Sequence, residues 1–214
     1  MTVMNAQPPH REALPDAVLV ADRFHTVALA NDMLTQVRQQ RVIRETQGRR
    51  GRKTDPAWAA RRRQLTGYER LRPETFARMW SSLIDTGDEG VQILQAYTVQ
   101  EELISLLALA GTNPERHLIG TRLGSFYQHA AATDAPEAHR LAATVQAWWP
   151  AIEAGILTGY SNARSEGYNR LAKHQGRNAF GFRNPINQRR RIRWACTRQH
   201  RRASAVSSTL PGQV

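Results

Sequence analysis

The spacing of hydrophobic and polar positions predicts a chain built mainly from helices. Apolar residues recur every three or four positions, which is the period of one buried helix face. The pattern predicts a helix from about His25 to Arg44, and it is strongest from Val91 to Ala110, where Gly111-Thr-Asn-Pro114 ends it. The same reasoning predicts helices over Trp58 to Gln64, Pro73 to Ile84, Pro114 to about Ala131, Pro136 to Ile156, Asn162 to His174 and Pro185 to about Arg198.

One segment has a different pattern. Ala17 to Ala21 is a short apolar run entered through Pro15-Asp16, which predicts a buried strand. Asp22 and His25 follow where this strand would pass into the first helix. Asp22 could cap that helix and His25 could be a core histidine, or both could lie at the carboxyl end of a strand, where α/β active sites gather.

Charge, glycine and proline divide the chain further. Basic residues dominate from Arg38 to Arg78, acidic residues from Ser81 to Thr158, and basic residues again towards the end, so we expect two DNA-facing segments separated by a structural one. The expected segments are a disordered lead-in (1–13), a strand and helix (14–47), a helical region with a basic linker at 48–63 (48–160), C-terminal helices (161–198) and a disordered tail (199–214).

Composition favours a nucleic-acid partner. The 214 residues carry a net charge of +12, mostly from arginine, which suits bidentate contacts with phosphate. A single cysteine, Cys196, excludes an internal disulfide, and no zinc pattern or P-loop is present. No apolar run approaches the roughly 20 residues of a membrane-spanning helix, and Met1 to Arg11 do not resemble a signal peptide. We therefore expect a cytoplasmic protein without a membrane partner.

Glu166 stands out because of its surroundings. From Gly159 to Arg202 it is the only acidic residue among twelve basic ones. It could form an ion pair with Arg164 or Arg170 on an exposed helix face, or it could hold a divalent metal beside a phosphodiester. Gly167, next to it, lowers helix propensity by roughly 1 kcal/mol and favours the close approach of a backbone or ligand.

Two further clusters have more than one interpretation. Trp148-Trp149 is expected in the core, with base stacking as the alternative. Arg189-Arg190-Arg191 has no acidic neighbour to balance it, which favours phosphate contact.

Five motifs in order resemble the C-terminal part of a bacterial insertion-sequence transposase of the ISL-three family, a DDE-type enzyme with an RNase H-like catalytic fold. The resemblance extends from about Leu14 to Arg202. The motifs are Val20-Ala-Asp22-Arg-Phe-His25, Arg49-Arg-Gly-Arg-Lys53-Thr-Asp-Pro56, Trp148-Trp149, Asn162-Ala-Arg-Ser-Glu166-Gly-Tyr-Asn169-Arg170 and Ala179-Phe-Gly-Phe-Arg183-Asn184.

The resemblance implies a fold and a set of roles. The fold would be mainly α, a helical insertion added to the C-terminal part of an RNase H-like α/β domain with one or few strands. Glu166 would be the third acid of a triad that holds Mg²⁺, and Asp22 and His25 would support the catalytic site as the family's D-x-x-H motif. DNA contacts are expected from Arg49, Arg50, Arg52, Lys53, Arg164, Asn169, Arg170, Lys173, Arg177, Arg183, Arg189, Arg190 and Arg191.

The chain departs from the family pattern at its beginning. Only 21 residues precede Asp22, and their acids, Glu12 and Asp16, do not match the family's acid-bearing segments. We therefore expect a truncated transposase that does not cut DNA alone and does not bind Mg²⁺ productively. The alternatives are a non-catalytic DNA-binding module that modulates an intact transposase, with which it could associate or self-associate, and an unfolded remnant.

Overall fold

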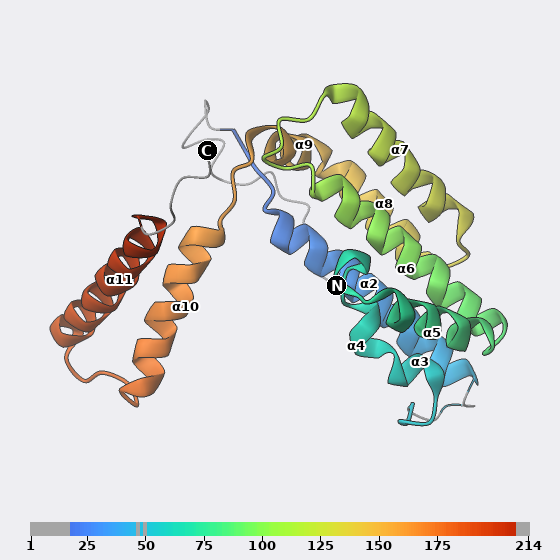
Figure 1. Ribbon diagram of the computed structural model, residues 1–214, viewed down its shortest axis with the longest axis horizontal. Coiled ribbons are helices and arrows are strands. Elements are labelled where there is room, and N and C mark those ends of the chain that lie inside the picture. Colours follow the sequence, from blue (N-terminus) through green and yellow to red (C-terminus); the bar gives the residue numbers. More distant parts are fainter. Residues whose placement is uncertain (1–17, 46–47, 49–50, 209–214) are drawn as a thin grey trace. The chain divides into compact units, whose positions relative to one another are not determined.

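The computed structural model describes residues 18–45, 48 and 51–208, and in this part of the chain it contains helices and no strand (Figure 1). The mainly helical fold class expected from the sequence is confirmed. The helices are α2 (Arg23–Glu45), α3 (Pro56–Ala59), α4 (Arg61–Gln64), η1 (Tyr68–Arg70), α5 (Pro73–Ile84), α6 (Asp88–Leu107), α7 (Arg116–Ala132), α8 (Pro136–Ala147), α9 (Trp149–Thr158), α10 (Ala163–Asn178) and α11 (Pro185–Ser208).

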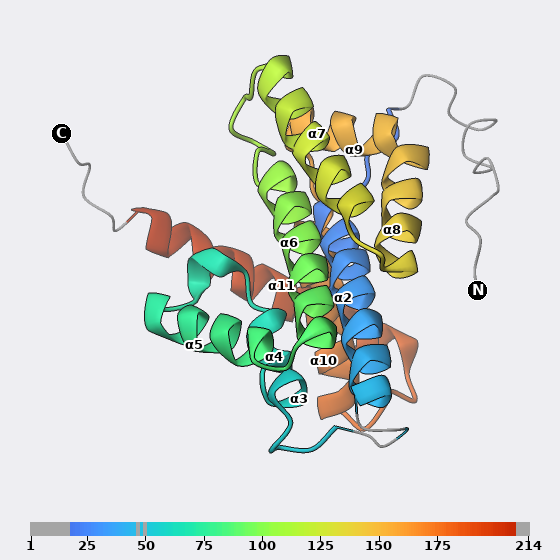
Figure 2. The same ribbon diagram turned by 90° about the vertical axis from the view of Figure 1, so that its right-hand side faces the viewer.

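The chain divides into two compact units, Met1–Tyr160 and Ser161–Val214. The first unit has a core around α2 and α6, which lie side by side in Figures 1 and 2. Leu34 of α2 and Leu103 of α6 are fully buried there, and α7 adds the buried ring of Phe126. Helices α2, α6, α7 and α8 therefore share one hydrophobic core.

The junction of α5 and α6 requires a glycine. Gly90, in the first turn of α6, lies so close to the end of α5 that a Cβ atom would stand 1.8 Å from the carbonyl oxygen of Leu83. That atom belongs to the backbone and cannot rotate away. Glycine at position 90 therefore lets the end of α5 lie closer to the start of α6 than any residue with a Cβ atom would permit.

A partly buried carboxyl group lies on α6. The backbone N–H of Tyr68 donates a hydrogen bond to Oε2 of Glu101 at 3.1 Å. Burial raises the pKa of Glu101 despite this hydrogen bond, because the charged form loses hydration. Burial, followed by the negative charge of Glu101, raises the pKa of Tyr97 one turn earlier.

The strand expected at Ala17 to Ala21 is not formed. Ala17 lies outside the described residues, and residues 18–22 have no regular structure. A strand needs a neighbouring strand to satisfy its backbone groups, and here the segment meets a helix. The N–H of Ala21 donates to the carbonyl of Ala151 in α9 at 2.9 Å, and Gly155 leaves room for this approach.

Several helix boundaries also differ from the expectation: the helix expected over Trp58 to Gln64 is two helices, α3 and α4, and α10 continues to Asn178 instead of ending at His174. The helix expected over Pro136 to Ile156 is two helices, α8 and α9, which meet at Trp148. Pro150 lies at the start of α9, where its missing N–H is tolerated, whereas the interior of one continuous helix would lose a hydrogen bond there. Helix α11 continues to Ser208, so residues 199–208 are helical although the sequence placed them in a disordered tail.

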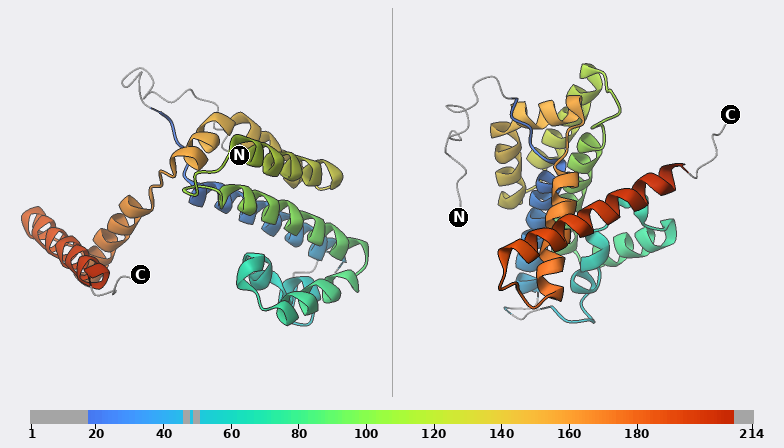
Figure 3. Two further views of the ribbon diagram at one scale, coloured as in Figure 1. Left: turned by 45° about the horizontal axis from the view of Figure 1, so that its top comes forward. Right: turned by 90° about the vertical axis from the view of Figure 1, so that its left-hand side faces the viewer.

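The second unit is a pair of neighbouring helices, α10 and α11, joined by a short turn (Figure 3). Asn184 caps α11: its Oδ1 accepts the backbone N–H of Ile186 at 2.8 Å, and Pro185 follows as the first helical residue. Ala195 is the one apolar side chain of this unit that is buried among the described residues. Most of the side chains that the structure describes in this unit are exposed.

None of the described helices combines the length and the apolar composition that a membrane crossing requires.

Candidate nucleic-acid interface

One face of α10 brings together five of the polar residues that the sequence singled out. Glu166, Asn169, Arg170, Lys173 and Arg177 are all exposed. They are spaced by three or four residues, so at about 100° per residue they fall within about 100° of the helix circumference. We call these five residues the α10 stripe.

Glu166 occupies the N-terminal end of the α10 stripe, in the first turn of the helix. A carboxylate is favoured there by the partial positive charge of the unpaired N–H groups. The ion pair expected with Arg170 is not present: the ion pairs found among the described side chains lie in the first unit. The side chain of Arg164 lies outside the described part, so the pair considered with that residue stays a prediction.

The arginines of α11 are exposed but do not share one face. Arg189, Arg190 and Arg191 follow one another, so each points about 100° away from the next. Arg193 lies one turn after Arg189 on the same side, and the guanidinium of Arg198 lies 5.1 Å from the ring of Trp194. A single strand of DNA could therefore contact only some of these arginines at once.

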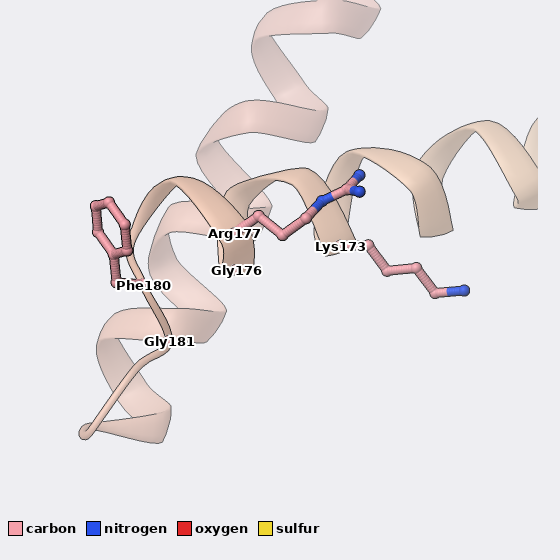
Figure 4. Close-up of a pocket in the computed structure, with 5 residues that line it drawn as sticks. All are labelled: Lys173, Gly176, Arg177, Phe180 and Gly181. Atoms are coloured by element: carbon pink, nitrogen blue, oxygen red, sulfur yellow. The ribbon is translucent and has the colours of Figure 1, made fainter.

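The turn between α10 and α11 forms a shallow concave surface. It is lined by Lys173, Gly176, Arg177, Phe180 and Gly181 (Figure 4). The ring of Phe180 is fully exposed. Arg183, two residues after this surface, is exposed as well.

The charge of the chain is concentrated in this unit. Residues 161–214 contain twelve of the 30 basic residues and one of the 18 acidic residues, which gives a formal charge of +11 and leaves +1 for residues 1–160. The sequence pattern had also placed DNA contacts in the first unit. There, Arg52 and Lys53 are exposed, whereas Arg49 and Arg50 lie outside the described residues.

Asp22 is the N-cap of α2. Its Oδ1 accepts the backbone N–H of Phe24 at 3.2 Å, while its Oδ2 is buried without a hydrogen-bond partner. His25 is exposed, with its ring edge-on to Phe24 at 5.8 Å between centroids. The interpretation of Asp22 as a cap is confirmed. That of His25 as a core histidine is wrong, because its side chain is exposed, whereas the next residue, Thr26, is buried.

The tryptophan pair lies where the sequence placed it. Trp148 and Trp149 are partly buried and pack against the core of the first unit. The core interpretation is confirmed.

The described residues do not fit a two-metal centre. Such a centre needs several carboxylates around two ions, and no group of three or more His, Cys, Asp or Glu side chains that could hold a metal occurs in the described part of the chain. Glu166 is the only acidic residue in the second unit by sequence. What the α10 stripe offers by itself is one carboxylate at the end of a row of cations.

Sequence reasoning missed the prominence of Phe180. Phe180 belongs to one of the five motifs, but an apolar residue between Ala179 and Gly181 carries no sign of being exposed. The available signal was Gly181, which marks the end of a helix and so places the preceding residue at its tip.

Comparison with known families gives a match over most of the chain. A family model described as transposase, which represents the DDE enzymes of the ISL-three group, matches residues 9–192. The comparisons with curated proteins and with solved structures give no match.

Proposed function

Because this chain belongs to the ISL-three family of DDE transposases, we propose that it acts in DNA transposition by holding DNA on the α10 stripe, with Glu166 next to the phosphodiester backbone. The family match supports the transposase-related role, and the α10 stripe supports the location. Three basic side chains and one amide follow the carboxylate along a single exposed face. Such a row can neutralise successive phosphates.

The charge distribution carries this proposal. A formal charge of +11 on residues 161–214 greatly exceeds what a helix pair needs for solubility. Because so few side chains of this unit are buried, the cations remain available to a polyanion. Phosphate contacts made by arginine also fix the register of a strand through paired hydrogen bonds.

Glu166 supplies one acid of the catalytic centre in this proposal. Enzymes of the family generally use divalent metal ions, which activate the attacking hydroxyl and stabilise the leaving oxygen. One exposed carboxylate does not hold two ions in place. We therefore propose that the 214-residue chain does not cut DNA alone. Strand cleavage by the purified chain with Mg²⁺ or Mn²⁺, abolished by Glu166→Gln, would overturn this statement.

Asp22 has a positioning role in the same proposal. Its cap fixes the point at which the segment before α2 turns into the helix, and this segment is held to α9 by the bond from Ala21 to Ala151. The arrangement supports a fixed junction rather than a direct contact with DNA. The exposed ring of His25 then lies one turn into α2, where it is accessible to another part of a transposition complex.

A second candidate function is a DNA-binding module that modulates an intact transposase. The concentration of charge in the unit that contains only one acid favours it. Glu166 separates the two candidates. A binding module is helped by Glu166→Gln, because the substitution removes a negative charge from the DNA-facing row.

The test measures DNA affinity of the wild-type chain and Glu166→Gln in Mg²⁺ and in Na⁺ at equal ionic strength. If Glu166 holds a metal beside the phosphate, Mg²⁺ raises the affinity of the wild type relative to the variant. If the chain is only a binding module, the variant binds more tightly by the same ratio in both salts. The control is Asn169→Ala. It changes a side chain of the same stripe without changing the charge, so it shows the effect of substitution alone.

A further inference from the structure

Phe180 is the most exposed large apolar side chain of the described residues. It lies at the tip of the second unit, between α10 and α11, with a relative exposure of 102%. A ring in this position contributes nothing to the core of the unit. Packing within the unit therefore does not account for this ring at the tip.

The backbone at this tip makes the phenylalanine more unusual. The N–H of Gly181 donates to the carbonyl of Gly176 at 2.9 Å, and the N–H of Phe180 donates to that of Arg177 at 3.0 Å. These two bonds form a Schellman motif, in which the residue at the place of Phe180 adopts the left-handed conformation and is usually glycine. Phe180 has φ +48°. The backbone alone would favour glycine here, so phenylalanine occupies this position against the backbone preference.

The surroundings of the ring are cationic. Lys173 and Arg177 line the same concave surface as Phe180 and Gly181 (Figure 4). Lys173 and Arg177 are separated by one turn of helix, about 6 Å along its axis, and both belong to the α10 stripe. Two cationic side chains and an exposed aromatic ring thus line one surface.

We propose that Phe180 stacks on an unpaired DNA base while Lys173 and Arg177 hold the phosphates next to that base. The inference rests on the proposed function, because it takes DNA as the ligand of the α10 stripe. Cations that follow a backbone, together with an aromatic ring on which a base stacks, are the two parts of a single-strand binding site. Bases inside an intact duplex are stacked on each other, so the ring discriminates in favour of single strands and open ends.

The test compares two DNA probes with the full-length chain: a single-stranded oligothymidine and a blunt duplex of equal length. Fluorescence anisotropy gives the dissociation constant of each at one fixed salt concentration. Phe180→Ala is expected to weaken single-strand binding by about 5- to 150-fold, the range for loss of one stacked base. Duplex binding should change less than twofold. Phe180→Trp should retain the single-strand affinity.

Two more variants separate stacking from folding and from surface hydrophobicity. Phe180→Gly suits the left-handed backbone, so it should keep or raise the melting temperature and still lose single-strand affinity. Ile186→Ala removes another exposed apolar side chain of the same unit and should leave binding unchanged. Phe180→Ala should also leave the salt dependence of binding unchanged, because it removes no charge.

Each outcome decides the proposal. Equal single-strand affinity of Phe180→Ala and the wild type contradicts it, and so does an equal loss on both probes. A Phe180 variant that changes only self-association of the chain assigns the ring to a protein contact and also contradicts it. If the wild type binds neither probe, the proposed function fails together with the inference. If it binds DNA independently of Phe180, only the inference fails.

Discussion

Removing the three cations of the α10 stripe tests the proposed interface quantitatively. In the triple variant Arg170→Gln, Lys173→Gln and Arg177→Gln, the exposed positions keep polar side chains of good helix propensity. Each phosphate contact on duplex DNA contributes about 0.9 to the slope of log affinity against log salt. If all three side chains contact phosphate, the slope becomes shallower by about 2.7.

This change is large enough to measure. Between about 50 and 200 mM salt, a slope difference of about 2.7 means that the wild type loses about 40-fold more affinity than the variant. Near 100 mM salt, the variant should bind at least about 100-fold more weakly, because the same three contacts are absent. The assay is a fluorescence-anisotropy titration of a labelled duplex at five salt concentrations.

A matched control separates local contact from overall charge. The variant Arg62→Gln, Arg70→Gln and Arg78→Gln removes the same charge from exposed positions of the first unit. Its slope should remain within about 0.5 of the wild-type slope, since these side chains make no phosphate contact in the proposal. Equal slopes for the two triple variants would refute the assignment of the interface to α10.

Three further predictions concern the first unit, and each uses thermal or urea unfolding. Gly90→Ala should lower stability by about 1–3 kcal/mol because its Cβ meets the backbone of α5, whereas Gly120→Ala, in open space on α7, should raise it by about 1 kcal/mol; equal effects would contradict the close approach. Asp22→Ala should cost about 1 kcal/mol through loss of the cap and Asp22→Asn much less; equal losses would mean that the charge matters rather than the cap. Because the pKa of Glu101 is raised in the folded state, its contribution to stability is present at low pH and is lost as the pH rises through that pKa, so Glu101→Gln should stabilise at pH 7 and not at pH 4; a stabilisation independent of pH would contradict the burial of its charge.

The helices were predictable because their periodicity reflects burial in one core. The bounds of α5 agree with the expectation, since Pro73 starts the helix and the apolar spacing ends with Ile84. The strand at Ala17 to Ala21 was not predictable in the same way. Apolar content shows that a segment is buried, whereas strand formation depends on a neighbour that the segment itself does not encode.

In the candidate site, too, some features were predictable from the sequence and others depended on the fold. The sequence singled out Glu166, Asn169, Arg170, Lys173 and Arg177, but the expected helix ended at His174, so the structure was needed to place Arg177 on the same face as the others. The exposure of Phe180 depends instead on a left-handed residue at the helix end, where phenylalanine is unusual. The sequence thus singled out the cations, whereas the exposure of the ring beside them was evident only from the folded backbone.

A photo-crosslinking experiment tests the central claim that DNA lies on the α10 stripe. A photoreactive residue replaces Lys173 in one full-length variant and His174 in another, because both are exposed and they point about 100° apart on the same helix. Efficient crosslinking to DNA from position 173, with little from position 174, is the predicted result. Equal crosslinking from both positions, or crosslinking only from a matched probe at Arg62 in the first unit, would contradict it.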